Sequence, residues 1–501
     1  MKAPFKILYS NDLTHIGTCV SPYHRRDEKF TRAMLDASVD ETANIGIDVH
    51  MLQPGFGWVP LWQSKILSPS QHWTWLQKTY NAKIPDQYLA YLLSGGDIVG
   101  DFIQRCYEKS LVPFISLRMN DTHFLDKLHS SDVDGGQLNL CEFYCCHPEY
   151  VLESSSNSWR DRGQNWAMPE VREYKFNFIR ELCENYDLKG LELDFMRYPA
   201  LFRPYETTQT QREAVLAEFV KKVRDLLDET SRGKKRWLSL RLPVNYGMYD
   251  ELGLNISRLE QAGVDMFNLS SIYFTAQGGD LSKIRSEVKT AATYVEMTHC
   301  ASVGAAVDQA DGDNFEFIKT SESQLYTTAL SAYAQGIDGV SLFNFVYYRE
   351  HGSEKKTTAV NEPPFGTIKH LRDREFASGR PQHYFLGSHW QDDGQLPKSI
   401  FIYGQHAEFT VENVLRRGAH NALLCVHIDN HDAGNWEAWF NERSIVKSCN
   451  PSCQWMTDGG NANLLAWSIP VEFLSEGKNQ IEFRSMDAVK SIIDFIELII
   501  W

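Results

Sequence analysis

The sequence predicts an α/β protein, a (β/α)8 TIM barrel followed by a C-terminal antiparallel, jelly-roll-like β-sandwich. Two observations predict this architecture. Short apolar strands alternate with amphipathic helices eight times within residues 1–378, which is the pattern of a parallel barrel. From residue 379 onward helical periodicity is almost absent, and short alternating segments recur with turn residues between them. We therefore expect a barrel domain at 1–378 and a sandwich domain at 379–501.

The barrel strands are expected where short runs of apolar residues end in polar or charged side chains. In chain order they are 5–9, 47–52, 113–119, 191–195, 237–245, 266–273, 293–299 and 340–345. Apolar residues at helical spacing predict the helices 28–43, 96–109, 169–185, 208–229, 255–262, 283–292 and 324–335. A tryptophan-rich loop follows the second strand. Residues 122–168 form a long insertion, and insertions of this length inside a compact domain are usually functional.

The sandwich strands are expected in seven short segments separated by turn signals. They are 399–403, 408–413, 421–429, 435–441, 464–469, 479–484 and 491–500. Trp436 and Trp439 lie on one of these strands, three residues apart, so they face opposite sides of it. At most one of the two is therefore exposed, which favours a bracing role for this domain over sugar binding.

The rest of the chain is organised around the stretch 169–199, a helix followed by a buried strand. Pro169 suits a first helical turn, and Gly190 ends the turn before the strand. Leu191, Leu193 and Phe195 face one side of that strand, while Glu192 and Asp194 face the other. The outer side of a parallel barrel packs on helices and must be apolar, so both acids should point inward, with Asp194 nearer the C-terminal mouth.

Glycoside cleavage needs two carboxyl groups flanking the bond. Asp194 on the fourth strand is one candidate. Glu296 on the seventh strand is the second, because it shares a face with Tyr294 and Thr298 near the strand end. Catalytic groups of TIM barrels lie at these C-terminal strand ends.

The motifs P-x-V-R-x-Y, I-x-E-L, Y-D, G and L-D-F-x-R-Y-P within 169–199 resemble the family-10-like glycosyl hydrolases. Lys189-Gly190-Leu191-Glu192 stands where relatives often have Asp-Gly-Ile-His. The resemblance implies a glycoside hydrolase, and the layout is similar to the large clan of retaining barrel glycosidases, which use carboxylates on strands four and seven. It implies Asp194 as general acid/base and Glu296 as nucleophile. The reverse assignment stays open, as does a role for Glu192, including raising the pKa of Asp194.

Substrate-binding candidates are the polar, charged and aromatic residues at or near the predicted strand ends. They are Asp12, His50, Trp58, Arg118, Asn120, Arg197, Asn245, Tyr273, His299, Asn344 and Tyr348. Tryptophans of the long loops suit stacking on sugar rings, but about half are expected to pack the loops onto the barrel instead. Arg118, Arg197 and Arg241 form a possible site for a sulfate or carboxylate on the sugar; the alternative is that each pairs with a local acid.

Composition excludes several classes of function. The net charge of −15 and the pI of about 5.6 argue against binding to nucleic acid or to an anionic membrane surface. No apolar run is long enough for membrane insertion, and the N-terminus lacks the apolar core of a signal peptide, so the protein is expected to be cytoplasmic, or periplasmic or secreted if a signal peptide has been removed. We find no dinucleotide or phosphate-binding motif and expect no cofactor and no metal.

The main interpretation is a glycoside hydrolase, of the retaining type, acting on a polysaccharide or its oligosaccharides. An anionic sugar, sulfated or uronic, is a hypothesis that rests on the arginines. Two alternatives are kept: a noncatalytic carbohydrate-binding barrel, and a metal-dependent polysaccharide deacetylase in which Asp12 and His50 would hold an ion. The sequence leaves the sugar, the linkage and the oligomeric state open.

Overall fold

The structure is a computed structural model, and it describes most of the chain. The described residues are 2–18, 29–125, 140–153, 162–272, 274–302, 317–346, 362–387, 396, 398–400, 405–416, 418–429, 436–448, 464–486 and 491–501. They divide into two compact units: Met1–Ile272, Ser282–Glu296 and Asp338–Asn344 form the first, and Tyr273–Leu281, Met297–Ile337 and Phe345–Trp501 form the second. The predicted domain boundary between residues 378 and 379 stays a prediction.

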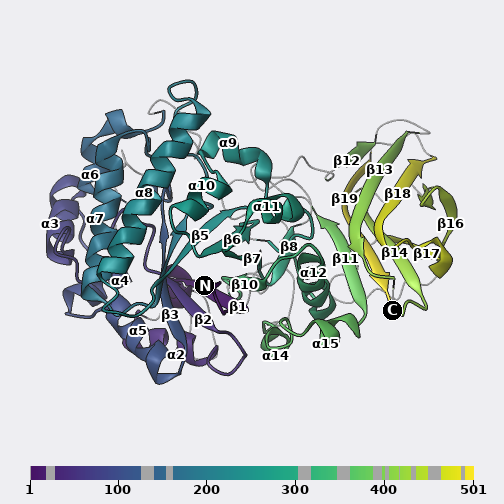
Figure 1. Ribbon diagram of the computed structural model, residues 1–501, viewed down its shortest axis with the longest axis horizontal. Helices are drawn as coiled ribbons and strands as arrows, with labels where there is room; N and C mark the ends of the chain where they lie inside the picture. The colour runs from purple at the N-terminus through teal and green to yellow at the C-terminus, as the bar shows by residue number, and fades with distance from the viewer. Residues whose placement is uncertain are drawn as a thin grey trace. The chain divides into compact units, whose positions relative to one another are not determined.

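The first unit contains a closed barrel of parallel strands, which confirms the predicted fold (Figure 1). Around the barrel the order is β1-β10-β7-β6-β5-β4-β3-β2. The strands are β1 (Ile7–Asp12), β2 (Val49–Gln53), β3 (Val112–Arg118), β4 (Gly190–Asp194), β5 (Trp237–Pro243), β6 (Met266–Ser270), β7 (Ala292–Met297) and β10 (Gly339–Phe343). Every one lies at a predicted strand.

The register of the central strands aligns charged residues at the mouth of the barrel. Arg118, the last residue of β3, pairs with Asp194, the last residue of β4, and Asp194 pairs with Arg241 of β5. One pleat lower, Ser116, Glu192 and Ser239 form a second row across the same three strands. Residues side by side in one register point to the same face of a sheet, so each row brings its side chains together.

The opposite end of the barrel interior is apolar. Leu8, Met51, Phe114, Met266 and Tyr294 belong to one buried cluster contributed by five different strands. Gly190 is required here, because a Cβ at this position would lie 2.3 Å from the ring of Phe114. The charged rows therefore lie on top of a packed hydrocarbon plug rather than around an open channel.

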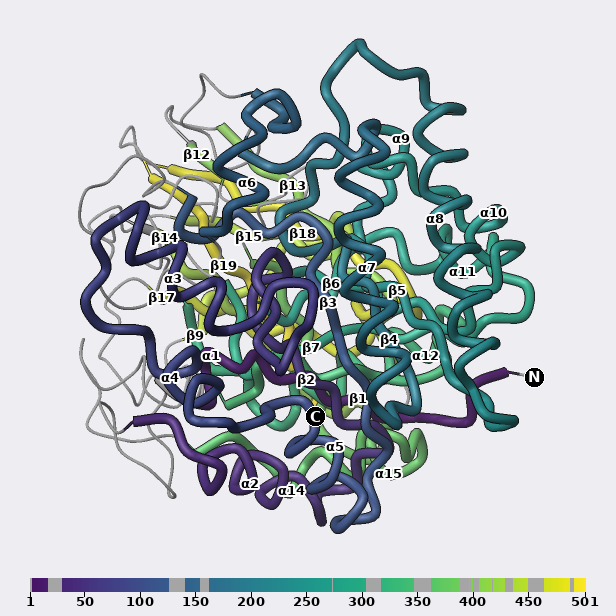
Figure 2. Tube along the Cα trace, turned by 90° about the vertical axis from the view of Figure 1, so that its left-hand side faces the viewer, coloured from purple at the N-terminus to yellow at the C-terminus, as the bar shows by residue number. Residues whose placement is uncertain are grey.

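Helices cover the outside of the barrel. They are α1 (Leu13–Thr18), α2 (Arg32–Asp40), α3 (Pro69–Tyr80), α4 (Gln87–Leu93), α5 (Ile98–Glu108), α6 (Glu142–Cys146), α7 (Pro169–Asn185), α8 (Gln209–Glu229), α9 (Tyr249–Leu252), α10 (Ile256–Gln261) and α11 (Leu281–Glu287). α7 and α8 pack against each other (Figure 2). The predicted tryptophan-rich loop after β2 contains two helices, α3 and α4, that were not predicted from the sequence.

The second unit contains an antiparallel sandwich, as predicted. Its strand order is β11-β19-β14-β17-β16-β15-β18-β13, with β12 also pairing to β19. The strands are β11 (Gln382–Gly387), β12 (Lys398–Ile400), β13 (His406–Val414), β14 (Ala422–Asp429), β15 (Trp436–Phe440), β16 (Arg443–Lys447), β17 (Leu464–Ile469), β18 (Gly477–Ser485) and β19 (Ser491–Ile500). Sequence reasoning missed β11 and β16, because neither shows a clear apolar alternation.

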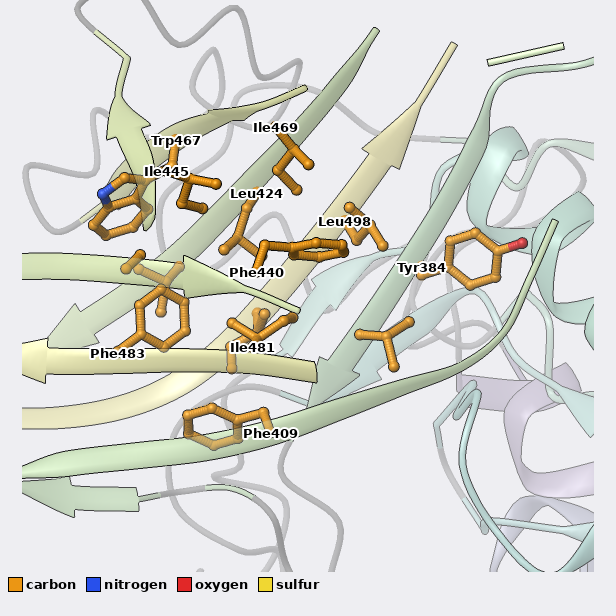
Figure 3. Close-up of a cluster of buried hydrophobic side chains, with 14 of the residues drawn as sticks. Tyr384, Phe409, Leu424, Phe440, Ile445, Trp467, Ile469, Ile481, Phe483 and Leu498 are labelled. Atoms are coloured by element: carbon orange, nitrogen blue, oxygen red, sulfur yellow. The ribbon is translucent and has the colours of Figure 1, made fainter. Parts of the chain in front are cut away.

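Large apolar side chains fill the space between the two layers of the sandwich (Figure 3). Phe409, Leu424, Phe440, Phe483 and Leu498 belong to this core. Trp436 is part of it, whereas Trp439 is only half-buried and the Arg484 guanidinium lies 4.5 Å from its ring. The two tryptophans of β15 thus face opposite sides, as their spacing predicts.

The second unit also contains short elements outside the sandwich. They are the hairpin of β8 (Cys300–Ser302) and β9 (Phe317–Lys319), and the helices α12 (Glu322–Ala334), α14 (Phe365–Ile368) and α15 (Arg374–Ser378). A search of the described residues of both units finds no helix with the length and apolar character that crossing a bilayer requires.

A buried lysine fastens the loop after β2 to the end of β3. Lys175 of α7 donates hydrogen bonds to the carbonyl oxygens of Gly57 and of Arg118, the second at 3.2 Å, and its Nζ lies 3.7 Å from the centre of the Trp58 ring. Burial lowers the pKa of Lys175 to about 7. Gly57 has φ +91°, and a Cβ there would lie 2.2 Å from the Arg118 oxygen.

We expect Gly57→Ala to lower the thermal midpoint of unfolding far more than Gly95→Ala. Both glycines have positive φ, which costs an L-residue about 1–2 kcal/mol, but a Cβ on Gly95 has no atom within 4 Å. The difference between the variants therefore measures the collision with the Arg118 carbonyl, together with the crowding of Lys175 Nζ, which would lie 3.0 Å from the new Cβ. Equal midpoints, measured by calorimetry, would mean that the loop moves away from β3 without cost.

Candidate active site

The two acids of β4 point into the barrel, as predicted. Glu192 accepts hydrogen bonds from Ser116 of β3 at 2.8 Å, from Ser239 of β5 at 3.1 Å and from Asn268 of β6 at 3.2 Å. Only an inward side chain can reach three other strands in this way. Burial, reinforced by the neighbouring Asp194 carboxylate, raises the pKa of Glu192 to about 7.

Asp194 is held at the mouth by donors on both of its oxygens. The backbone N–H groups of Met196 and Arg197 each donate to Oδ1 at 3.0 Å. Gln53 of β2 donates to Oδ2 at 3.2 Å, and Nη1 of Arg241 donates to the same oxygen at 3.0 Å. A carboxyl surrounded in this way acts as an acceptor in all of its contacts.

Glu296 of β7 binds the same arginine. Nε and Nη2 of Arg241 donate to its two oxygens at 2.8 and 2.6 Å, and Ser270 of β6 donates at 2.6 Å. The side chains of Arg241, Asp194 and Glu296 are all fully buried. The structure therefore brings together the two acids that the sequence singled out, with one guanidinium bound to both.

A second ion-paired group adjoins the first. Arg118 donates to Asp12 of β1 and, at 2.9 Å, to Asp121 in the loop after β3. Its Nε donates to the Gln53 oxygen at 3.1 Å, so the Gln53 amide connects Arg118 to Asp194. For Asp12, burial acts to raise the pKa, but Arg118, His15 and Thr14 together outweigh it and lower the value.

These contacts decide between the two interpretations of the arginines. Arg118 binds the carboxylates of Asp12 and Asp121, and Arg241 binds those of Asp194 and Glu296. Their positive charge is used inside the protein, so the local pairing weighed as the alternative describes both of them better than an anion site does.

Two predicted substrate-binding residues are buried in packing contacts. His50 points outward from β2, where its Nδ1 is 3.1 Å from the Thr42 hydroxyl and its ring packs edge-on against Phe102 of α5. The Trp58 side chain is fully buried, and its Nε1 donates to the Asp121 carbonyl at 2.8 Å. His50 packs a helix onto the barrel, and Trp58 packs a loop, so neither offers a surface to a sugar.

Three predicted asparagines have structural contacts. Asn120 holds the backbone of the insertion, accepting from the Gln164 N–H at 2.8 Å and donating to its carbonyl at 3.0 Å. Asn245 caps the short helix after β5 by accepting from the Gly247 N–H at 2.8 Å. Asn344, with φ +44°, accepts from the Asp12 N–H at 2.8 Å and so orients the start of the β1 loop.

The four remaining predicted residues lie in different parts of the chain. His299 is buried in the second unit, where its ring lies 5.5 Å from that of Phe345. Tyr273 and Tyr348 lie outside the described residues. Arg197 is at the mouth, with its Nη2 2.7 Å from Nε2 of His123.

The deacetylase alternative requires Asp12 and His50 to share an ion. Asp12 points into the barrel toward Arg118, and His50 points out of it toward α5. Within the described part of the chain, no group of three His, Cys, Asp or Glu side chains has an arrangement that would hold a metal. The geometry of these two residues does not fit this function.

Sequence reasoning missed two residues of the site and gave a third only a minor role. Gln53 ends β2, and an amide at a strand end gives little chemical signal by itself. His123 follows Asp121 in the insertion, where no periodicity marks its position. Arg241 alternates with leucines in β5, and that alternation was a usable sign that it points inward.

Solved structures match this chain only at low similarity. No protein-family model matches the chain, and no curated protein sequence matches it. A cycloisomaltooligosaccharide glucanotransferase of Paenibacillus sp. has TM-score 0.32 and 11% identity over 97% of this chain, which spans 57% of that protein.

Two further solved structures show the same level of similarity. The PgaB glycoside hydrolase domain of Bordetella bronchiseptica has TM-score 0.43 and 8% identity, covering 74% of this chain and 99% of its own. Catalytic domain 2 of the Ostrinia furnacalis Group II chitinase has TM-score 0.40 and 10% identity, covering 75% and 97%. These values concern the barrel fold alone. No comparison shows membership of the family-10-like glycosyl hydrolases.

We expect Glu192→Gln to stabilise the protein at pH 8 and to change little at pH 4.5. Folding raises the pKa of Glu192 from its ordinary 4.5 to about 7. As pH rises through this window the unfolded chain releases the proton first, so wild-type stability falls while that of the variant does not. Each pH unit in the window is worth about 1.4 kcal/mol.

Denaturant unfolding at both pH values measures this difference. Exposed Glu218 on α8 is the matched control, since its replacement by Gln adds no buried group. A Glu192→Gln effect that is the same at pH 4.5 and pH 8 would show that Glu192 keeps its ordinary titration in the fold.

Proposed function

We propose that the chain is a glycoside hydrolase that cleaves a polysaccharide or its oligosaccharides, with Asp194 and Glu296 as the catalytic pair. The observation that carries the proposal is the shared guanidinium: Arg241 binds both carboxylates at the C-terminal ends of β4 and β7. Catalytic groups of TIM barrels lie at those ends. The retaining type is carried over from the expectation that the sequence resemblance gave.

The hydrogen bonds favour the reverse of the assignment implied by the sequence resemblance. Two donors to Asp194 are backbone N–H groups, which cannot become acceptors. Arg241 donates to both acids and cannot become an acceptor for either, so the difference lies in the other contacts. Ser270 and Asn268, which contact Glu296, can present an oxygen instead of a hydrogen once rotated. We therefore assign Asp194 as nucleophile and Glu296 as general acid/base. Glu192 lies one row deeper, and the charge on its carboxyl group affects the electrostatic environment of Asp194.

An anionic sugar is not part of this proposal, because Arg118 and Arg241 are each paired with two carboxylates. A noncatalytic carbohydrate-binding barrel is the second candidate. It is favoured by the complete burial of both proposed catalytic side chains, because the groups that cover them must move before a substrate can reach them. It predicts binding of an oligosaccharide without release of reducing ends.

We expect Asp194→Asn and Glu296→Gln to separate the two roles. Removal of the acid/base should slow cleavage of an oligosaccharide by about 10²–10⁴-fold. It should spare the initial burst of dinitrophenolate from a dinitrophenyl glycoside, whose leaving group needs no proton, while hydrolysis of the covalent intermediate stays slow because it needs the same residue as base. Removal of the nucleophile should abolish turnover of both. The assay is a panel of neutral and acidic polysaccharides and dinitrophenyl glycosides, scored by reducing ends and by released dinitrophenolate.

Glu218→Gln serves again as the matched control and should behave as wild type. Wild-type turnover in Asp194→Asn would remove that residue from the mechanism. Binding of an oligosaccharide by calorimetry with no turnover of any member of the panel would establish the noncatalytic candidate instead.

A further inference from the structure

His123 lies in the loop after β3 and is fixed by the neighbouring Asp121. Its Nδ1 is 2.8 Å from Asp121 Oδ1, and its backbone N–H donates to the same oxygen at 2.8 Å. The Asp121 side chain is fully buried, while that of His123 is 27% exposed. The carboxylate thus holds a partly exposed imidazole at the edge of the charged network.

The other ring nitrogen of His123 identifies its protonation state. Nε2 lies 2.7 Å from Nη2 of Arg197. A guanidinium is always protonated and only donates, so Nε2 must be the acceptor. The ring proton is then on Nδ1, where it is donated to Asp121, and His123 is neutral.

Aromatic contacts fix the plane of the ring. Phe56 is stacked on it, with centroids 4.6 Å apart and planes inclined by 21°. Tyr198 meets it edge-on at 5.0 Å, and the Arg197 guanidinium lies 4.3 Å from the Tyr198 ring. Loops after three strands, β2, β3 and β4, therefore converge on His123.

Arg197 connects this cluster to Asp194. Its side chain binds His123, while its own backbone N–H donates to Asp194 Oδ1 at 3.0 Å. Met196 donates to the same oxygen from the adjacent peptide. If a movement of the Arg197 side chain also displaces its backbone, the hydrogen bond from the Arg197 N–H to Asp194 Oδ1 will change.

We propose that His123 is a positioning residue: its neutral Nε2 anchors Arg197 and thereby fixes the 196–197 backbone that orients Asp194. Protonation of Nε2 would place two donors and two positive charges against each other and release the anchor. The anchor itself is a property of the fold, whereas its effect on turnover rests on the proposed hydrolase function.

The sign of the pH dependence follows from the groups around the ring. Burial lowers the pKa of His123 below its ordinary 6.5; Asp121 acts to raise it, and Arg197 and Arg118 act to lower it. Tyr198 and Phe56 contribute no charge at neutral pH. The anchor is therefore intact at neutral pH and is lost as pH falls through the lowered pKa, so turnover should decline on the acid side.

The anchor is tested first without any substrate, by NMR titration of histidine-labelled full-length protein, with His123→Gln assigning the signal. We expect the His123 pKa to lie below 6.5 in the wild type and to rise in Arg197→Met, because the facing positive charge is gone. A His123 pKa that is the same in both proteins would overturn the anchor.

The kinetic consequence is tested on a dinitrophenyl glycoside that the wild type cleaves. His123→Gln keeps an acceptor near the Nε2 position but does not titrate, so it should retain turnover at pH 8 and lose the acid-side decline. His123→Phe keeps the stacking but removes the acceptor, and should lower kcat about tenfold with KM little changed. An unaltered acid-side decline in His123→Gln would overturn the positioning role.

The two measurements distinguish failure of this inference from failure of the proposed function. If the wild type cleaves no glycoside, the hydrolase proposal fails, and the NMR titration still decides whether His123 anchors Arg197. If the wild type cleaves a glycoside and the Arg197→Met titration shows no shift, only the anchor is wrong.

Discussion

The guanidinium of Arg241 lies between the carboxylates of Asp194 and Glu296, and the charged half of the barrel interior depends on it. Two ionised carboxylates cannot be buried this closely without compensating positive charge and donors. Removing one partner of such a group typically costs about 3–5 kcal/mol, because it leaves charge uncompensated. The apolar cluster at the other end of the same interior shows that the fold also accommodates hydrocarbon there.

Strand register converts this single interaction into an extended network. Arg118, Asp194 and Arg241 are neighbours across β3, β4 and β5, so charges of opposite sign alternate along the row. The Gln53 amide accepts from Arg118 through its oxygen and donates to Asp194 through its nitrogen. It therefore links the ion-paired group of Arg118 to that of Arg241. Glu192, one pleat lower, accepts from two hydroxyls and an amide, and burial together with the neighbouring Asp194 carboxylate raises its pKa to about 7.

Outside the barrel interior, loops carry the support for this network. Lys175 donates to the carbonyl oxygens of Arg118 and Gly57, so it fixes the end of β3 to the loop after β2. The contact between His123 Nε2 and Arg197 Nη2 joins the loop after β3 to the loop after β4. Trp58, which the sequence offered as a sugar platform, is part of this support. A buried lysine above an indole ring stabilises a loop; it does not leave the indole free for a ligand.

The sequence alone determined the properties that depend on local pattern. Alternation along 191–195 decided that Glu192 and Asp194 face inward, and the succession of strands and helices decided the barrel, because both follow from backbone geometry within a few residues. Only the tertiary structure decided which inward residues meet. Closure of the barrel places Glu296 and Asp194 on one arginine, turns His50 outward against α5, and brings His123 to Arg197 from 74 residues away. Those contacts depend on register and loop path, which no local pattern encodes.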